Sequence, residues 1–162
     1  MNQIITWDEI DFTWILEGKL ANSGYPFNKH LPFLWNKGIR AIISIERRPD
    51  KSKHKLISQG FDYLEVTWKD FTAPTLSQLD TINQFIDEKI AENKPVLVHC
   101  FQGMRSGTAI ISYLVYSGVF GTCEEAYRYV RETKGVRTAA NINEQKAILR
   151  EYTEAARPSN VR

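Results

Sequence analysis

Short runs of apolar, β-type residues alternate along this chain with segments of helical periodicity. After a predicted hairpin around Glu17-Gly18, helical segments over residues 28–37, 51–59 and 75–90 alternate with strands over residues 39–45, 61–66 and 96–98. Such alternation implies that the strands pair in parallel and that the helices pack on the sheet. The sequence therefore predicts an α/β fold with a central, mostly parallel, twisted sheet flanked by helices.

Length and composition favour one compact unit. The chain has 162 residues, 43% of them hydrophobic, which suits a single domain over residues 1–162 with a core over about 12–155 and frayed termini. The net charge of +2 does not indicate a nucleic-acid partner, and no apolar run is long enough for a membrane span. The N-terminus lacks a signal-peptide pattern, and two cysteines make no disulfide framework, so we expect a cytoplasmic protein.

The segment HCFQGMRSGT, residues 99–108, joins the apolar strand 96–98 to an apolar helical segment over residues 109–116. Backbone N–H groups at a helix N-terminus have no intrahelical partner and attract anions. The same field stabilises a thiolate at Cys100, and Arg105 adds a planar cationic fork that matches two oxygens of a phosphate group. The segment therefore predicts a nucleophile inside an oxyanion-binding loop.

The motif His99-Cys100-x-x-Gly103, followed by Arg105-Ser106-Gly107-Thr108, resembles the signature loop of cysteine-based protein tyrosine phosphatases, especially the small dual-specificity type. The resemblance implies a dual-specificity-phosphatase-like fold and hydrolysis of phosphate monoesters through a cysteinyl-phosphate intermediate. In it, Cys100 would attack phosphorus, Arg105 would clamp the phosphate, and Ser106 would assist departure of the thiolate. The remaining loop residues would bind phosphate through their backbone: Phe101, Gln102, Gly103 and Met104. His99 and Thr108 would support the loop.

The loop departs from that family in its length. Four residues separate Cys100 from Arg105, whereas the family has five, and the missing position falls between Gly103 and Arg105. A shorter loop offers fewer N–H donors to a phosphate. The spacing Cys-x4-Arg also resembles the active loop of rhodanese-type sulfurtransferases. A sulfurtransferase and a weakly active phosphate-binding module therefore stay open as alternatives.

A second motif favours the phosphatase interpretation. Trp68-Lys69-Asp70-Phe71-Thr72-Ala73-Pro74 follows the predicted strand 61–66 and precedes a helix, which is similar to the general-acid loop of small dual-specificity phosphatases. Asp70 is the implied acid. A phosphate ester expels an alkoxide or phenoxide that needs a proton, whereas sulfur transfer has no comparable need. The resemblance implies a phosphorylated protein or a small phosphomonoester as substrate, and no cofactor.

Several residues have open roles. Gln145 or Asn141 would orient the hydrolytic water if the last connection follows the related phosphatases, although Asn141 is equally explained as a helix cap. We interpret Cys123 as structural, with a resolving thiol as the alternative. His30 and His54 do not form a metal-binding pattern. The basic run over residues 47–55 is either a solvated loop or a rim that attracts acidic substrates; its cations are Arg47, Arg48, Lys51, Lys53 and Lys55.

Overall fold

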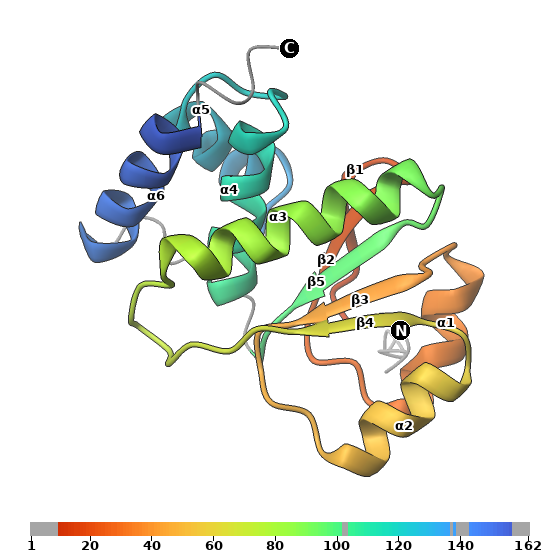
Figure 1. Cartoon of the computed structure of the whole chain (residues 1–162). Helices are drawn as coiled ribbons and strands as arrows, with labels where there is room; N and C mark the ends of the chain where they lie inside the picture. Colours follow the sequence, from red (N-terminus) through yellow and green to blue (C-terminus); the bar gives the residue numbers. More distant parts are fainter. Residues whose placement is uncertain (1–9, 102–103, 137, 139–142, 157–162) are drawn as a thin grey trace, which may run out of the picture.

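The computed structural model of this protein describes residues 10–101, 104–136, 138 and 143–156. The strands among them form one five-stranded sheet with the order β1-β2-β5-β3-β4 (Figure 1). The strands are β1 Thr13–Leu16, β2 Leu20–Ser23, β3 Ala41–Ser44, β4 Asp62–Glu65 and β5 Val96–His99. β1 and β2 form the predicted antiparallel hairpin, and all other neighbours pair in parallel. The predicted α/β fold with a mostly parallel sheet is confirmed.

Helices cover both faces of the sheet (Figure 1). One face carries α1 Leu31–Asn36 and α2 Asp50–Ser58, with the short 3-10 helix η1 Asn28–His30 before α1. The other face carries α3 Leu76–Ala91, α4 Met104–Tyr116, α5 Cys123–Arg128 and α6 Asn143–Ala156, with the π-helical turn η2 Tyr129–Thr133 after α5. No helix in the described ranges is long and apolar enough to cross a membrane.

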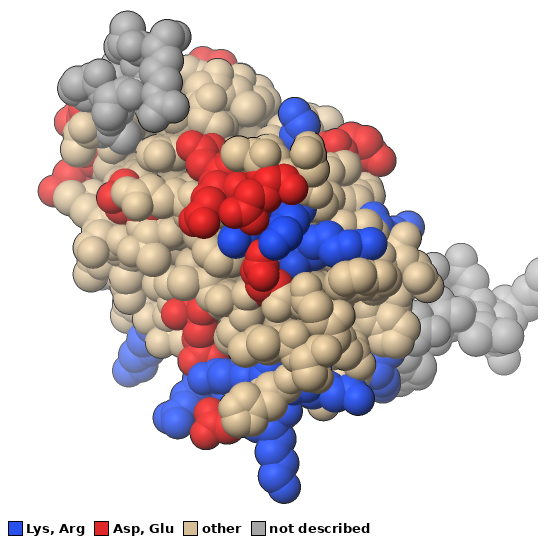
Figure 2. All heavy atoms as spheres, turned by 45° about the vertical axis from the view of Figure 1, so that its right-hand side comes forward, with Lys and Arg blue, Asp and Glu red and all other residues tan. Residues whose placement is uncertain are grey.

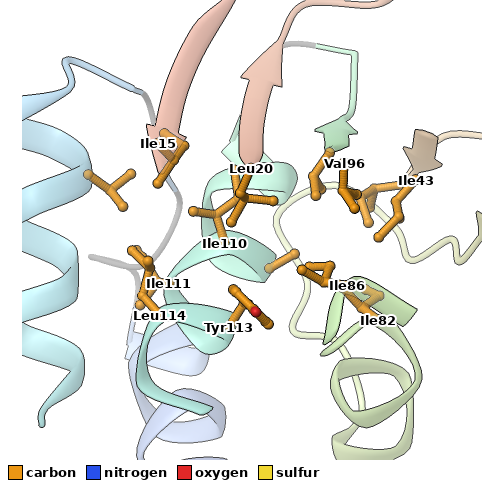
Figure 3. Close-up of a cluster of buried hydrophobic side chains, with 14 of the residues drawn as sticks. Ile15, Leu20, Ile43, Ile82, Ile86, Val96, Ile110, Ile111, Tyr113 and Leu114 are labelled. Carbon is orange, nitrogen blue, oxygen red and sulfur yellow. The ribbon is translucent and has the colours of Figure 1, made fainter. Parts of the chain in front are cut away.

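Alternate residues of the central strands point to opposite faces and build two separate cores. Val96 and Val98 of β5 pack with side chains of α3 and α4, such as Ile86 and Ile110 (Figure 3). Leu97, between them, belongs to the second core under α1 and α2. Both cores are closed to solvent, so β5 is a buried central strand. The packing on both of its faces fixes the position of the residue that follows β5.

The predicted helix caps are found where they can be described. Thr75 Oγ1 accepts from the backbone N–H of Gln78 at 3.1 Å, and Gln78 Oε1 accepts from the N–H of Thr75 at 2.9 Å, which completes a capping box at α3. Thr122 caps α5 by accepting from the N–H of Glu125 at 3.2 Å. The third predicted capping pattern begins at Asn141, which lies outside the described residues.

The carboxyl ends of β2, β5 and β3 meet at one edge of the sheet, with β5 in the middle (Figure 1). The register places His99, the last residue of β5, beside Ser23 of β2 and Ser44 of β3. Residues that follow these strands therefore come together although they are far apart in the sequence. Cys100 is the first residue after β5, so this edge is the place to look for a functional site.

The interpretation of the basic run over residues 47–55 as a solvated loop is wrong for Arg48. Arg48 is fully buried, where its guanidinium donates to the carbonyl of Pro26 and lies 5.0 Å from the ring centre of Tyr25. Lys53 pairs with Glu65 at 3.0 Å. Three cations of the run are exposed: Arg47, Lys51 and Lys55. Figure 2 shows Lys and Arg side chains gathered at the lower end of the molecule, where α2 lies.

Candidate active site

Cys100 lies between the end of β5 and the beginning of α4, and it is 1% exposed. Its Sγ lies 3.6 Å from the hydroxyl of Ser106, within the first turn of α4. The first-turn N–H groups of a helix have no intrahelical acceptor, so this helix end favours negative charge near the thiol. Phe101 follows with an exposed ring, whereas Gln102 and Gly103 lie outside the described residues.

His99 contacts the backbone of the loop and the neighbouring strand β3. Its Nδ1 lies 3.3 Å from the carbonyl oxygen of Cys100, and its Nε2 lies 2.5 Å from Ser44 Oγ. Because a carbonyl can only accept, Nδ1 carries the hydrogen and Nε2 accepts from the Ser44 hydroxyl. Complete burial lowers the pKa of His99 to about 3, so the ring is neutral at physiological pH. The histidine therefore orients the backbone at the nucleophile and carries no charge.

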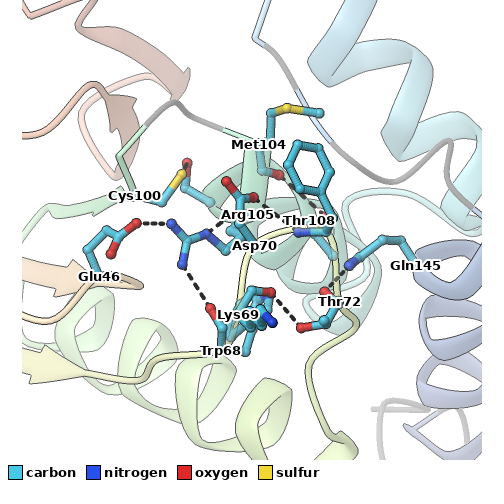
Figure 4. Close-up of polar contacts among 12 residues, drawn as sticks. Glu46, Trp68, Lys69, Asp70, Thr72, Cys100, Met104, Arg105, Thr108 and Gln145 are labelled. Atoms are coloured by element: carbon cyan, nitrogen blue, oxygen red, sulfur yellow. Dashed lines mark hydrogen bonds and ion pairs between the residues drawn. The ribbon is translucent and has the colours of Figure 1, made fainter.

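Arg105 connects the Cys100 loop with the Asp70 loop (Figure 4). Its Nη1 donates to the carbonyl of Trp68 at 2.8 Å, and its Nη2 donates to the carboxylate of Glu46. Its Nε lies 3.6 Å from Asp70 Oδ1 and has no hydrogen-bond partner among the described residues. Burial lowers the pKa of Arg105 from its ordinary value, but a guanidinium stays protonated. The buried Nε–H, ion-paired with Asp70 but without a hydrogen bond, is a donor that an oxyanion could use.

Asp70 stands on a tight turn beside this guanidinium. The N–H of Thr72 donates to the carbonyl of Lys69 at 3.1 Å, which closes the turn around Asp70. Asp70 Oδ1 also accepts from the N–H of Phe71 at 3.2 Å. The Asp70 side chain remains 40% exposed, so it can be reached from solvent. The structure thus brings the predicted acid to the predicted phosphate clamp.

Ser106 and Thr108 both lie buried in α4 and differ in their contacts. The hydroxyl of Ser106 donates to Asn22 Oδ1 at 2.7 Å, next to the Cys100 sulfur. Thr108 Oγ1 donates back to the carbonyl of Met104 at 3.5 Å and so reinforces the first turn of the helix. Ser106 thus contacts the thiol, whereas Thr108 contacts only the backbone of its own helix in these hydrogen bonds.

Sequence reasoning missed two residues of this site. Glu46 lies two residues beyond β3 and pairs with Arg105, and Asn22, in β2, holds Ser106. Asn22 lies in one of the two strands that flank β5, and Glu46 follows the other. A polar side chain at the carboxyl end of a predicted parallel strand was the available signal, because such ends line a common crevice. The sequence pattern did not show which strands neighbour β5.

The other candidates lie at different places. Gln145 is buried and its Nε2 donates to the carbonyl of Thr72 on the Asp70 loop, whereas Asn141 lies outside the described residues. Cys123 contacts α6, with its Sγ 2.9 Å from Thr153 Oγ1, and burial raises the pKa of this thiol. Among the described residues, no group of three or more His, Cys, Asp or Glu side chains could hold a metal ion.

Comparisons with known proteins identify the family of this chain. A family model described as "Polymorphic toxin system, DSP-PTPase phosphatase" matches residues 19–119, a range that includes Asp70, Cys100 and Arg105. The tyrosine-protein phosphatase CDC14 of Saccharomyces cerevisiae is 26% identical over 117 residues, which are 72% of this chain and 21% of the yeast protein. The chain thus matches about a fifth of the length of that relative.

Solved structures give the same result for the fold. The active form of Tk-PTP is 29% identical, with a TM-score of 0.79, over 89% of this chain and 97% of that one. PTPMT1 has a TM-score of 0.78 at 20% identity, over 91% of this chain and 97% of its own, and so supports the fold alone. None of these matches supports the sulfurtransferase alternative.

Proposed function

Because the chain belongs to the DSP-PTPase phosphatase family, we propose that it hydrolyses phosphate monoesters through a cysteinyl-phosphate intermediate. One observation carries the proposal: the buried guanidinium of Arg105 lies beside the Asp70 loop and in the same helical turn as Ser106, which contacts Cys100. The thiol, the guanidinium and the carboxyl group that the proposal uses thus lie close together, and the buried Nε–H of Arg105 makes no hydrogen bond within the described residues.

In the first step the Cys100 sulfur attacks phosphorus. The S–P bond forms while the P–O bond to the leaving group breaks, and the Asp70 carboxyl group donates a proton to the departing oxygen. Arg105 and the first-turn N–H groups of α4 bind the equatorial oxygens, where negative charge accumulates in the transition state. General acid catalysis by Asp70 contributes about 10²–10⁴-fold.

In the second step water attacks the cysteinyl phosphate. The S–P bond breaks, inorganic phosphate leaves, and the Asp70 carboxylate takes the proton from water. The Ser106 hydroxyl, 3.6 Å from the sulfur, turns its hydrogen from Asn22 to the departing thiolate. This hydrogen bond stabilises the leaving group without a full proton transfer. Two easier displacements thereby replace one difficult hydrolysis.

The substrate class follows from the surface around Cys100. The exposed ring of Phe101 lies 6.4 Å from the ring centre of Tyr25, which lies 4.9 Å from that of the exposed Phe27. Aromatic faces of this kind stack on an aromatic leaving group. The exposed cations of the basic run, Arg47, Lys51 and Lys55, belong to the segment that follows β3, the strand beside β5. We infer a phosphorylated protein as substrate, with phosphotyrosine preferred and acidic neighbours favoured.

The direct test is hydrolysis of p-nitrophenyl phosphate by the full chain, compared with Cys100→Ser and Arg105→Lys. We expect release of p-nitrophenol by the unmodified protein, no turnover by Cys100→Ser, and a loss of about 10²–10³-fold by Arg105→Lys. Thiocyanate formed from thiosulfate and cyanide, with the phosphate ester untouched, would show a sulfurtransferase instead. Phosphate binding without turnover of either substrate would show a binding module.

We also propose that the protein works in a reducing compartment, such as the cytoplasm. Both cysteines of the chain, Cys100 and Cys123, are free thiols. A catalytic thiolate must remain reduced, because sulfenic acid formation abolishes its nucleophilicity. Fractionation of cells that express the protein, with detection of reduced Cys100 by alkylation, tests this location.

A further inference from the structure

Two helices hold the first part of the loop that carries Asp70. On α3, Gln78 Nε2 donates to the carbonyl of Thr67 at 3.0 Å. On α4, Arg105 Nη1 donates to the carbonyl of Trp68 at 2.8 Å (Figure 4). Both acceptors lie just before Asp70 in the chain. The side of the loop that precedes the acid is therefore attached to the body of the protein by two backbone carbonyls.

A third helix holds the other side of this loop. Gln145, on α6, donates from Nε2 to the carbonyl of Thr72, two residues beyond Asp70 (Figure 4). Gln145 is only 1% exposed, and its Oε1 is closed to solvent and has no hydrogen-bond partner among the described residues. A buried amide oxygen without a hydrogen-bond partner destabilises a fold. The hydrogen bond to the Thr72 carbonyl is thus the favourable polar contact of this side chain, and it offsets part of that destabilisation.

The turn between these attachment points needs such support. Phe71 has a φ of 61°, in the left-handed region that non-glycine residues disfavour. Its ring is 60% exposed, so burial of the side chain does not offset the backbone strain. Strained residues persist where the surrounding structure holds them in place. The carbonyl of the next residue, Thr72, is the atom that Gln145 holds.

We propose that Gln145 is a positioning residue that holds the Asp70 loop beside Arg105 and so sets the efficiency of proton donation to the leaving group. This inference rests on the proposed phosphatase function. It replaces the expectation that Gln145 orients the hydrolytic water, because the oxygen that would accept from that water is buried away from solvent. It also gives α6, which lies outside the family match over residues 19–119, a role in the acid step.

Leaving-group dependence tests the proposal. Gln145→Met keeps the length and apolar part of the side chain and removes the donor; Gln84→Met, at an exposed position on α3, is the matched control. For phenyl phosphate, whose leaving group needs a proton, we expect kcat/KM of Gln145→Met to fall on the order of tenfold. For 2,4-dinitrophenyl phosphate, whose leaving group does not, we expect less than about a twofold change. Gln84→Met should change neither.

The same variant in an Asp70→Asn background should cause no further loss on phenyl phosphate, because the positioned acid is already absent. Equal losses of kcat/KM on the two esters would overturn the proposal. Hydrogen exchange of residues 67–75 gives a readout independent of activity: faster exchange in Gln145→Met than in Gln84→Met supports the contact, and equal rates overturn it. If the unmodified protein hydrolyses neither ester, the proposed function fails, while the exchange result still decides whether Gln145 holds the loop.

Discussion

Glu46 and Arg105 form an ion pair that joins the residues following two neighbouring strands, β3 and β5. The two residues are 59 positions apart in the chain, and the Nη2 of the buried guanidinium donates to the partly exposed carboxylate. With Nη1 on the Trp68 carbonyl, this pair fixes the direction in which Nε points. The cationic fork is therefore oriented before any phosphate enters, which reduces the reorganisation needed during reaction.

We expect Glu46→Ala to lower kcat/KM for p-nitrophenyl phosphate by about 10–100-fold, because a charge-assisted hydrogen bond of about 1.5–3 kcal/mol that orients Arg105 is lost. Glu46→Gln keeps an acceptor oxygen and should lose less than Glu46→Ala. Steady-state kinetics and the affinity for orthovanadate measure both effects. Glu17→Ala, at an exposed position of the β1–β2 turn, is the control. Tighter vanadate binding by Glu46→Ala would instead show that the carboxylate competes with phosphate.

Stability should fall as the pH is lowered from about 6.5 toward about 3, the window between the ordinary pKa of histidine and that of buried His99. In this window the unfolded chain binds a proton that the folded chain does not, so acid favours unfolding. Above about pH 6.5 the histidine is neutral in both states, and no stability is lost through it. At about pH 4.5 the loss from this one residue is of the order of 2–3 kcal/mol.

Urea unfolding at about pH 7.5 and about pH 4.5 measures this pH dependence. We expect His99→Gln to have the smaller difference in free energy of unfolding between the two pH values, since glutamine does not titrate. His54→Gln, at an exposed position of α2, should keep the difference of the unmodified protein. An unchanged difference in His99→Gln would mean that other groups carry the acid sensitivity.

Ser106→Ala should slow the hydrolysis of the cysteinyl phosphate more than its formation, because the hydroxyl that stabilises the departing thiolate is removed. Rapid-mixing kinetics with p-nitrophenyl phosphate should then show a burst of p-nitrophenol followed by a slow steady state. Asn22→Ala removes the acceptor that orients this hydroxyl at 2.7 Å, and it should give a smaller burst. Ser58→Ala, at the exposed end of α2, should give none. Equal slowing of both steps in Ser106→Ala would contradict this assignment.

Phe101→Ala should lower kcat/KM for a phosphotyrosine peptide by about 3–10-fold, because an aromatic stacking contact contributes about 0.5–1.5 kcal/mol beyond its buried area. A phosphoserine peptide of the same flanking sequence should be affected less than about twofold, since it presents no ring to stack. Val119→Ala, an exposed apolar residue after α4, serves as the control. An equal loss on both peptides would assign Phe101 to loop structure instead of substrate selection.

Local features were predictable because they depend on residues close in the sequence. The capping box of Thr75 and Gln78 is closed by neighbours three residues apart and was found as expected. Cys100 and Ser106 likewise belong to one continuous strand–loop–helix unit, so their proximity follows from local geometry. The Cys-x4-Arg spacing alone left a sulfurtransferase open, and the placement of Asp70 beside Arg105 together with the family match favours the phosphatase.

Long-range contacts were not predictable in this way. Arg48 lies in a basic run typical of a solvated loop, yet tertiary packing buries it against Pro26 and Tyr25. The sequence by itself determined the strand, loop and helix that present a thiol at a helix N-terminus, since these follow from local periodicity and capping. Only the tertiary structure decided that Glu46 contacts Arg105 and that Gln145 contacts the loop that carries Asp70. The reason is that strand order and helix packing, which create these contacts, depend on side chains distributed over the whole chain.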